Sequence, residues 1–382
     1  MEFLVFGEDW GRHPSSSQHL LQEIGEHYEV HWVNSIGLRQ PSLNFKDLLR
    51  IGEKLMAAGK ADTSCQPAQE SPEATSMTKP TSIIKPLVWP MAQHPLARQL
   101  NSLLLKRQVS AKHSQRVVWA ALPSAVDYLD ICDSDLVIYY CGDDFSALAG
   151  VDHQLAADAE RRLVARADII FACSHALHAK FPADKTVLLP HGVHLSQFAN
   201  ATTCPVDIAP DKPSIGFYGS LNNWLDQSLI VRLAKARPNI NFYFIGREDS
   251  DIASLRQHPN ITLLPAKPHH QLPQYLQHWT MAILPFVDNE QIRACNPLKM
   301  REYLAAGCPV ISSPFPATAP YRDLITTASS EAEWLATIDH YCQWTPQQRS
   351  NHAELAYLAV SNESWSFRAT QAIDVIKQKL AI

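Results

Sequence analysis

Short apolar runs alternate with longer amphipathic stretches along most of this chain, and this rhythm limits the folds open to it. Apolar runs of four or five residues without polar alternation are typical of buried parallel strands. The amphipathic stretches between them turn the pattern into βα repeats, so the sequence predicts a doubly wound α/β protein. The predicted strands are Phe3–Phe6, Val30–Val33, Val117–Ala120, Leu136–Tyr140, Ile169–Ala172, Val187–Leu189, Ser214–Tyr218, Phe242–Ile245, Ile261–Leu264, Met281–Leu284 and Pro309–Ser312.

The rhythm breaks once, at residues 200–213 (NATTCPVDIAPDKP), which contain three prolines. Proline-rich, aperiodic sequence is typical of a linker. We therefore expect a Rossmann-like domain over residues 1–200, a linker at 201–213 and a second Rossmann-like domain over 214–360. In such sheets ligands lie at the carboxyl ends of the strands, so both domains should face one cleft.

Composition excludes several classes of protein. The chain has 382 residues, a formal net charge of −5 and 46% hydrophobic residues, which is ordinary for a globular protein with no general attraction to nucleic acid. The N-terminus MEFLVFGEDWG lacks the basic and long apolar regions of a secretory signal, and no apolar run is long enough to span a membrane. The eight cysteines form no CxxC pair and have no zinc spacing. We expect a cytoplasmic protein without a metal site.

One segment departs from the mildly acidic average. Residues 74–126 contain no Asp or Glu, and within them residues 79–116 carry seven Lys or Arg side chains among apolar ones such as Leu100 and Leu103. A basic segment of this kind can lie on an anionic membrane face. It is equally consistent with a solvated helix that turns one apolar stripe to the core. The sequence leaves both interpretations open.

The most informative motif is Asn296–Val310 (NPLKMREYLAAGCPV), between two predicted strands. Asn296 suits a helix N-cap and Pro297 the first helical position, and Gly307 suits the C-terminal end. The first helical turn, with Leu298, would then point free N–H groups at an anion. Lys299 adds a positive charge there. Glu302 lies on the same helix face, where a carboxylate can accept hydrogen bonds from ribose hydroxyls.

This motif resembles the donor-binding helix of GT-B glycosyltransferases, particularly the bacterial polysaccharide enzymes of families 1 and 4. The resemblance implies two Rossmann-like domains that face a cleft, with residues 361–382 forming a helix that crosses back to the first domain. It implies that Lys299 binds the donor diphosphate and that Glu302 binds the ribose. Five further segments carry it, over roughly residue 135 to the end: YYCGDD (139–144), ADIIFACS (167–174), LPHGVH (189–194), IGFYGS (215–220) and NESWSFR (362–368).

The resemblance also suggests the reaction. It implies transfer of a sugar from a nucleotide-sugar co-substrate to a glycan or lipid-linked acceptor, with no cofactor and no metal. Tyr218, Gly219 and Ser220, after the first strand of the second domain, would line the donor site. Arg247, after the next strand, could stack on the base or reach a phosphate. We expect no nucleic-acid partner, because neither the donor nor the acceptor of this reaction is a nucleic acid.

Two departures from the family pattern concern the donor site. Many retaining relatives carry a second glutamate eight residues before the ribose glutamate, where this chain has Ala294. Many also carry Arg and Lys in the first loop of the second domain, which here reads SLNNW (220–224). The donor sugar and the stereochemistry of transfer are therefore left open.

The first domain offers candidates for the acceptor side. The loop after its first strand contains Asp9 and His13, either of which could act as general base, and Arg12, which could hold an acceptor phosphate. The alternative is a plain βα turn. Asp143 and Asp144 follow another strand, and we interpret Asp143 as a catalytic candidate and Asp144 as acceptor-binding.

Two other functions remain possible on the same scaffold. A nucleotide-sugar epimerase would keep the donor site without an acceptor surface. A non-catalytic binding protein would keep only the fold, which Ala294 favours and Lys299 with Glu302 opposes. A dehydrogenase is excluded, because no GxGxxG follows a strand.

Overall fold

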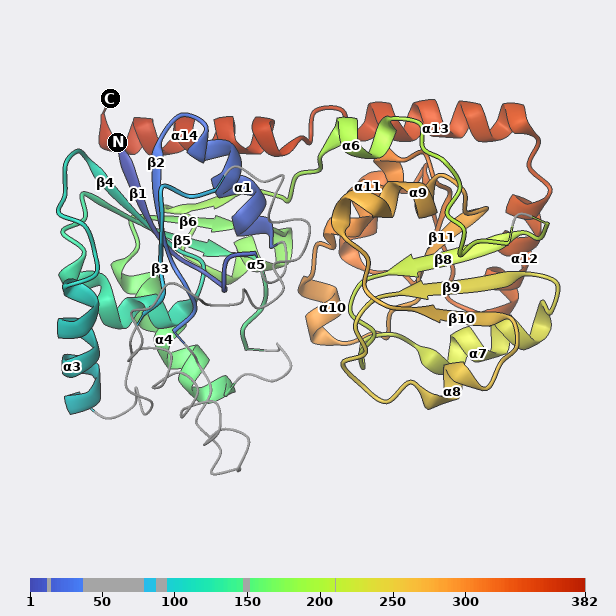
Figure 1. Cartoon of the computed structure of the whole chain (residues 1–382), viewed down its shortest axis with the longest axis horizontal. Coiled ribbons are helices and arrows are strands. Elements are labelled where there is room, and N and C mark those ends of the chain that lie inside the picture. Colours follow the sequence, from blue (N-terminus) through green and yellow to red (C-terminus); the bar gives the residue numbers. More distant parts are fainter. Residues whose placement is uncertain (12–14, 37–78, 87–94, 147–151, 210, 382) are drawn as a thin grey trace, which may run out of the picture. The chain divides into compact units, whose positions relative to one another are not determined.

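The computed structural model describes residues 1–11, 15–36, 79–86, 95–146, 152–209 and 211–381. The chain divides into two compact units, each with its own sheet and helices (Figure 1). Unit 1 comprises Met1–Ala172, Phe181–Val187 and Gln378–Ile382, and unit 2 comprises Cys173–Lys180 and Leu188–Lys377.

Unit 1 is built on a seven-stranded sheet of order β3-β2-β1-β4-β5-β6-β7. The described strand registers are parallel, and β1, β4 and β5 are buried along their whole length. The strands are β1 (Glu2–Phe6), β2 (Glu29–Val33), β3 (Ser82–Ile84), β4 (Arg116–Ala120), β5 (Leu136–Cys141), β6 (Ile169–Ala172) and β7 (Thr186–Leu188). The helices are α1 (Ser16–Gly25), α3 (Pro95–Lys106), the 3-10 helix η2 (Pro123–Ile131) and α4 (His153–Arg166).

Unit 2 contains a six-stranded sheet of order β10-β9-β8-β11-β12-β13, again with parallel registers. Counted within the unit, this is the 3-2-1-4-5-6 order of a Rossmann sheet, and it reverses between β8 and β11. The strands are β8 (Ser214–Tyr218), β9 (Asn241–Ile245), β10 (Ile261–Leu264), β11 (Met281–Leu284), β12 (Val310–Ser312) and β13 (Ile325–Thr327).

Most helices of unit 2 lie around this sheet (Figure 1). Side-chain caps begin several of them: Asp226 accepts from the amide of Leu229 in α7, and Ser330 and Thr345 form capping boxes in α12 and α13. The helices are α5 (His175–Lys180), α6 (Leu195–Ala199), α7 (Gln227–Ala236), α8 (Ala253–Arg256), η3 (His269–Gln271), α9 (Leu272–Leu276), α10 (Glu290–Ala294), α11 (Leu298–Ala305), η4 (Pro316–Tyr321), α12 (Glu331–Cys342), α13 (Pro346–Val360) and α14 (Trp365–Leu380).

All eleven predicted strands are present, with ends within one residue of those expected. The prediction missed β3 and β13, which have three residues each and lie at sheet edges. A three-residue edge strand has too few buried positions for a clear apolar run; in β3, for example, Ile83 is 39% exposed.

The predicted linker at 201–213 differs from the division that the structure shows, because this segment lies inside unit 2. Its polar groups bond to that unit: the amide of Thr202 donates to Gln277 Oε1 at 2.9 Å, and the amide of Ala209 donates to the Tyr243 hydroxyl at 3.0 Å. Ile208 is 5% exposed within the core of the unit. At the other end of the chain, α14 belongs to unit 2 as far as Lys377, and Gln378 onward groups with unit 1.

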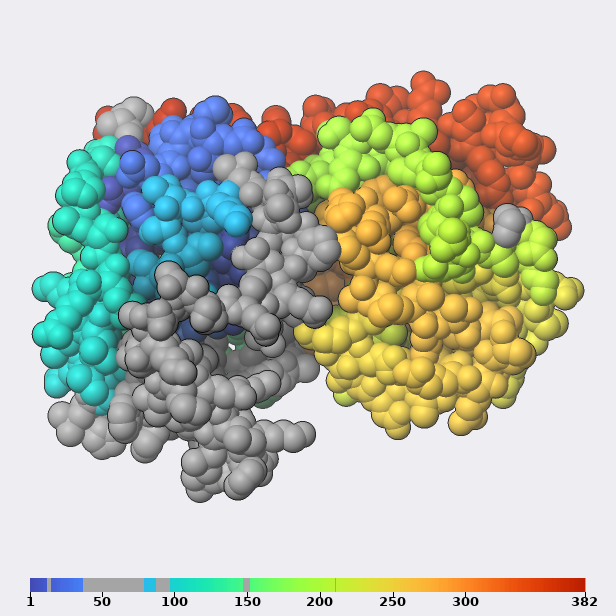
Figure 2. All heavy atoms as spheres, viewed as in Figure 1, coloured from blue at the N-terminus to red at the C-terminus, as the bar shows by residue number. Residues whose placement is uncertain are grey.

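The basic segment contains β3 and α3 in its described part. The atoms of α3 lie on the outer surface of unit 1, where Leu100 is 45% and Leu103 62% exposed (Figure 2). The opposite side of the helix is buried at Asn101 and Leu105. The helix therefore has both a core-facing side and an exposed apolar side. Within the described residues, no helix is long and apolar enough to cross a membrane.

Candidate functional site

The predicted donor loop begins where β8 ends. Gly219 has a φ of +135°, and a Cβ there would lie 2.4 Å from Lys299 Nζ. Gly246, which follows β9, approaches the backbone of Gly219. A Cβ on Gly246 would lie 1.8 Å from the carbonyl oxygen of Gly219. Two glycines thus let the turns after adjacent strands touch, at the carboxyl edge where a Rossmann sheet binds its ligand.

Helix α11 begins one residue later than predicted, at Leu298, with Pro297 as N-cap and no side-chain cap. The side chain of Asn296 is used elsewhere: its Nδ2 donates to the carbonyl of Cys173 at 2.6 Å, and its Oδ1 accepts from Arg301 at 2.7 Å. The amides of the first turn therefore receive no side-chain acceptor, which suits them to an anion. The helix ends as expected, with Gly307 at a φ of +68°.

Lys299 has no ion pair or hydrogen bond within the described part of the chain. Its Nζ lies 4.5 Å from the centroid of the Phe217 ring and 5.9 Å from that of Phe286. Burial lowers the pKa of Lys299 to about 8, and the charge of Glu302 opposes that shift. Lys299 and Glu302 form no ion pair with each other. An ammonium held over aromatic rings without a carboxylate partner suits an anionic ligand.

Glu302 is 8% exposed, and two side chains from other elements hold its carboxylate. Tyr218 donates its hydroxyl to Oε2, and His269 Nε2 lies 2.7 Å from Oε1. Burial opposes ionisation of Glu302, but His269, Tyr218 and the charge of Lys299 outweigh it and keep the pKa below its usual range. The carboxylate is therefore ionised and oriented, with lone pairs left to accept further hydrogen bonds.

Ser220 and Arg247 form a second group at this edge, joined through Asp249. Ser220 donates its hydroxyl to Asp249, and Arg247 donates from Nε to Oδ1 at 2.5 Å and from an Nη atom to Oδ2 at 2.9 Å. The Asp249 carboxylate raises the pKa of Arg247. Arg247 can reach a phosphate or a base only by exchanging this partner.

Sequence reasoning missed three residues of this site: His269, Asp249 and Phe217. His269 lies 33 positions before Glu302 along the chain, and Asp249 lies 29 positions after Ser220. Their neighbourhood depends on strand order, which no local motif encodes. A usable signal was the position of His269 and Asp249 in loops that follow β10 and β9, on the ligand edge of the sheet.

The acceptor-side candidates in unit 1 fall into two groups. Asp9 is bonded to the loop that follows β2, where its Oδ1 accepts from the amide of Ser35 at 3.2 Å and from the Ser35 hydroxyl at 2.7 Å. Asp144 likewise accepts from the hydroxyl of Ser146 at 2.6 Å. Arg12 and His13 lie outside the described residues.

Asp143 follows β5, and desolvation together with the charge of Asp144 raises its pKa. Sequence reasoning passed over a neighbouring carboxyl, Glu8, which accepts from the Ser15 hydroxyl at 3.0 Å. Burial raises the pKa of Glu8, and the charge of Asp143 adds to that rise. Glu8 and Asp143 are thus the described carboxyls of unit 1 that combine a raised pKa with a position after a strand.

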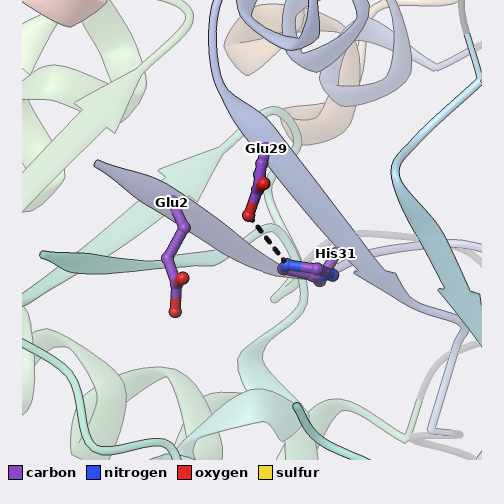
Figure 3. A group of neighbouring side chains, drawn as sticks. All are labelled: Glu2, Glu29 and His31. Carbon is purple, nitrogen blue, oxygen red and sulfur yellow. Dashed lines mark ion pairs between the residues drawn. The ribbon is translucent and has the colours of Figure 1, made fainter. Parts of the chain in front are cut away.

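A third cluster joins Glu2, Glu29 and His31 at the start of β1 and β2 (Figure 3). One possible ligand atom of each lies within 4.8 Å of the others, and His31 Nε2 is 3.9 Å from Glu29. However, the buried Glu2 carboxylate accepts from Arg116 Nε at 2.6 Å. The guanidinium already neutralises the one buried acid of the cluster, so we assign these residues to the stability of the sheet.

Comparison with known proteins concerns the part of the chain that contains the pair Lys299 and Glu302 and the group of Ser220 and Arg247. Residues 212–341 match the protein family described as glycosyl transferases group 1. This part of the chain is similar to the domain that the group 1 glycosyl transferases share. It contains Lys299, Glu302, Ser220 and Arg247, and hence every charged residue of the predicted donor site.

The chain is also similar in sequence to a curated protein. The chain is 27% identical over 249 residues to TuaH of Bacillus subtilis (strain 168), whose name proposes a glycosyltransferase of teichuronic acid biosynthesis. The match covers 59% of this chain and 62% of TuaH, which is less than two thirds of that relative.

Solved structures extend the likeness to the whole fold. The structure of HepE from Anabaena in complex with UDP-glucose has a TM-score of 0.69 at 13% identity, over 99% of this chain and 100% of HepE. A glycosyltransferase from Rickettsia africae has a TM-score of 0.70 at 11% identity, over 99% of this chain and 98% of its own. Sucrose-phosphate synthase from Thermosynechococcus elongatus has a TM-score of 0.69 at 12% identity, over 100% and 99%. The chain therefore has the GT-B fold.

Proposed function

We propose that this protein is a glycosyltransferase that moves a sugar from a nucleotide-sugar donor to a glycan or lipid-linked acceptor in cell-surface polysaccharide biosynthesis. The observation that carries the proposal is the ammonium of Lys299, which has no carboxylate partner in the described chain and lies at the uncapped start of α11. Glu302 follows on the same helix as an ionised, oriented carboxylate. A cation beside free amides suits a diphosphate, and a carboxylate one turn further suits a ribose.

In this proposal the donor binds unit 2. The diphosphate contacts Lys299 and the first amides of α11, the ribose contacts Glu302, and Tyr218, Gly219 and Ser220 line the loop beside it. Arg247 exchanges Asp249 for the base or a phosphate. Because the HepE structure holds UDP-glucose, a UDP-sugar is the first donor to test. No metal is required in this arrangement, since protein groups carry the positive charge.

The reaction joins the acceptor oxygen to the anomeric carbon of the sugar. The bond from that carbon to the β-phosphate oxygen breaks, and the nucleoside diphosphate leaves with the electron pair. The acceptor hydroxyl gives its proton to a base of unit 1. Among the described residues, Asp143 and Glu8 fit this role better than Asp9, because neither is held by Ser35 and both have a raised pKa.

The experiment that tests the donor site is a thermal-shift panel of UDP-, GDP-, dTDP- and ADP-sugars. A ligand at about 100 times its Kd adds about 2.7 kcal/mol to the free energy of unfolding, which is easily measured. We expect one nucleotide class to stabilise the wild type, and Lys299→Ala and Glu302→Ala to lose the effect. The exposed Lys235→Ala and Glu354→Ala, in the same unit, serve as controls. A folded protein that no nucleotide-sugar stabilises would contradict the proposal.

Product analysis then separates the transferase from its alternatives. Incubation of the protein with the stabilising nucleotide-sugar and a membrane extract should release nucleoside diphosphate and label an acceptor. An epimerase would instead convert the donor into its epimer without an acceptor. A protein that binds the donor but yields neither product would be a binding protein.

We further propose that the protein works at the cytoplasmic face of an anionic membrane, through residues 79–116. The exposed Leu100 and Leu103 of α3 support this, as does the adjoining pair Lys106 and Arg107, which is also exposed. Flotation with vesicles should show binding to anionic but not to neutral lipid. The double variant Leu100→Ser with Leu103→Ser should reduce it, whereas Leu355→Ser with Leu358→Ser, equally exposed in unit 2, should not. Equal binding by both double variants would oppose the proposal.

A further inference from the structure

His269 is the one histidine in the described chain whose ring is within hydrogen-bond distance of Glu302, and no sequence motif points to it. Its Nε2 lies 2.7 Å from Glu302 Oε1, on the opposite side of the carboxylate from the Tyr218 hydroxyl at Oε2. The three residues come from η3, α11 and β8. Each carboxylate oxygen thus has one protein donor, and the plane of the carboxylate is defined by both.

The ring of His269 is itself held in place. The ring centroid of the buried Phe198 lies 5.4 Å away at an interplanar angle of 69°. The Gln197 side-chain amide lies 3.1 Å from Nδ1 and donates to the backbone carbonyl of His269 at 3.2 Å. The contact with the carbonyl requires the NH2 group of the amide, so the same group donates to Nδ1.

These contacts determine which ring nitrogen carries the proton. Since Nδ1 accepts a hydrogen bond from Gln197, the proton is on Nε2, which then donates to Glu302. A proton on Nδ1 would face the amide hydrogens of Gln197. An imidazole that carries its proton on Nε2 satisfies both neighbours at once.

We infer that His269 is a positioning residue that orients Glu302 toward the ribose, and that it thereby sets the preference of the site for ribose over 2′-deoxyribose. This inference rests on the proposed function. A carboxylate that accepts one bond at each oxygen keeps further lone pairs for two adjacent hydroxyls. A carboxylate free to rotate would lose this two-point contact while its charge remained.

The test compares the affinity of ribonucleotides with that of their 2′-deoxy counterparts. The probes are the pairs UDP and 2′-deoxy-UDP, GDP and 2′-deoxy-GDP, and ADP and 2′-deoxy-ADP, measured by calorimetry on the full chain. We expect the best-bound ribonucleotide to bind the wild type at least about tenfold more tightly than its 2′-deoxy form. His269→Ala should reduce this ratio below about threefold. His269→Gln should restore it, because its amide can also donate to Glu302.

Three further variants separate positioning from general damage. Lys299→Ala should weaken both members of a pair equally, so that the ratio is kept. His278→Ala removes another partly buried histidine of unit 2, one that bonds to the backbone of Gln274, and should change nothing. Gln197→Leu keeps the imidazole but removes the two contacts of the Gln197 amide that hold it against Glu302, so the ratio should fall at least threefold even if His269→Ala does not fold. Nitrogen-15 spectra of the wild type should show a protonated Nε2 and an unprotonated Nδ1.

The outcomes distinguish this inference from the proposed function. If Glu302→Ala abolishes the ribose preference while His269→Ala and Gln197→Leu keep it, the inference is wrong and the donor site stands. An imidazole protonated on Nδ1 alone would also overturn the inference. If the wild type binds none of the six nucleotides, the proposed function fails, and the inference with it.

Discussion

The ammonium of Lys299 lies 4.5 Å from the centroid of the Phe217 ring, and a Cβ on Gly219 would touch it at 2.4 Å. A cation is thus held between an aromatic face and a glycine backbone, with no carboxylate bonded to it in the described chain. The charged form of Lys299 is therefore unfavourable in the free protein and becomes favourable once an anion binds. Two predictions follow from this arrangement.

The affinity for a nucleoside diphosphate should depend on the charge of Lys299. Burial lowers the pKa of this residue to about 8, and a bound diphosphate favours the charged form. Above pH 8 binding must therefore take up a proton, and the affinity should fall roughly tenfold or more between pH 7 and 9.5. Calorimetric titrations with UDP across this range measure the effect. Lys299→Ala should bind weakly with a flat profile in the same range, and a wild type with a flat profile would contradict the prediction.

Lys299→Met should stabilise the free protein while it removes donor binding. The pKa in the folded state is below that of the unfolded chain, so the folded state loses stability by keeping the amine charged below pH 8. This cost disappears as the pH rises towards the unfolded value. We expect the Tm of the ligand-free variant to rise by about 1–3 °C at pH 7, and the gain to shrink by pH 10. A lower Tm at pH 7 would mean that the contact with Phe217 outweighs the cost of burial.

Gly246→Ala should destabilise unit 2 because of the close approach of two turns. A Cβ at this position would lie 1.8 Å from the backbone oxygen of Gly219, which cannot move as the end of a side chain can. We expect a loss of about 2–4 kcal/mol in the free energy of unfolding, measured by urea denaturation. Gly25→Ala is the matched control, since its Cβ would meet Val30 at an ordinary 3.6 Å. Equal stabilities of the two variants would show that the turns after β8 and β9 can separate freely.

Glu363→Gln should destabilise the start of α14, where one carboxylate serves two arginines. Arg301 Nε donates to Glu363 at 2.5 Å, Arg368 lies 3.3 Å away, and both arginine side chains are less than 10% exposed. Removal of the charge leaves two buried guanidinium groups without their shared carboxylate, at a cost of about 3 kcal/mol, although Asn296 still accepts from Arg301. In contrast, Arg161→Ala breaks a pair in which the arginine is 80% exposed, and it should cost less than about 0.5 kcal/mol. Chemical denaturation would measure the loss in the free energy of unfolding for each variant. Similar losses for Glu363→Gln and Arg161→Ala would refute the expected role of burial.

Local sequence pattern was enough to predict the backbone of the fold. The buried strands lack polar alternation because both faces of a parallel sheet are covered, so β8 and β11 could be recognised from a few residues each. Helix α11 could also be recognised from local sequence, because Gly307 marks its end. Its start was misplaced by one residue, because the Asn296 side chain bonds to Cys173, far away along the chain, rather than to its own helix.

The charged residues of the donor site were predicted only where they share one helix. Lys299 and Glu302 are three positions apart on α11, so helical geometry alone places them together. His269 and Asp249 could not be found in this way, because they come from other βα loops. In unit 1, the bond between Asp9 and Ser35 likewise depends on which loops follow adjacent strands.

The βα rhythm, the two-sheet fold and the helix that carries Lys299 and Glu302 could thus be predicted from the amino-acid sequence, because each depends on residues close together in the chain. The position of Lys299 over Phe217 without a carboxylate, and the contacts of Tyr218 and His269 with Glu302, became visible only in the folded protein. Burial, and hence charge state and hydrogen-bond direction, depends on strand order in the sheet. Strand order brings distant loops to one edge, and no local pattern records it.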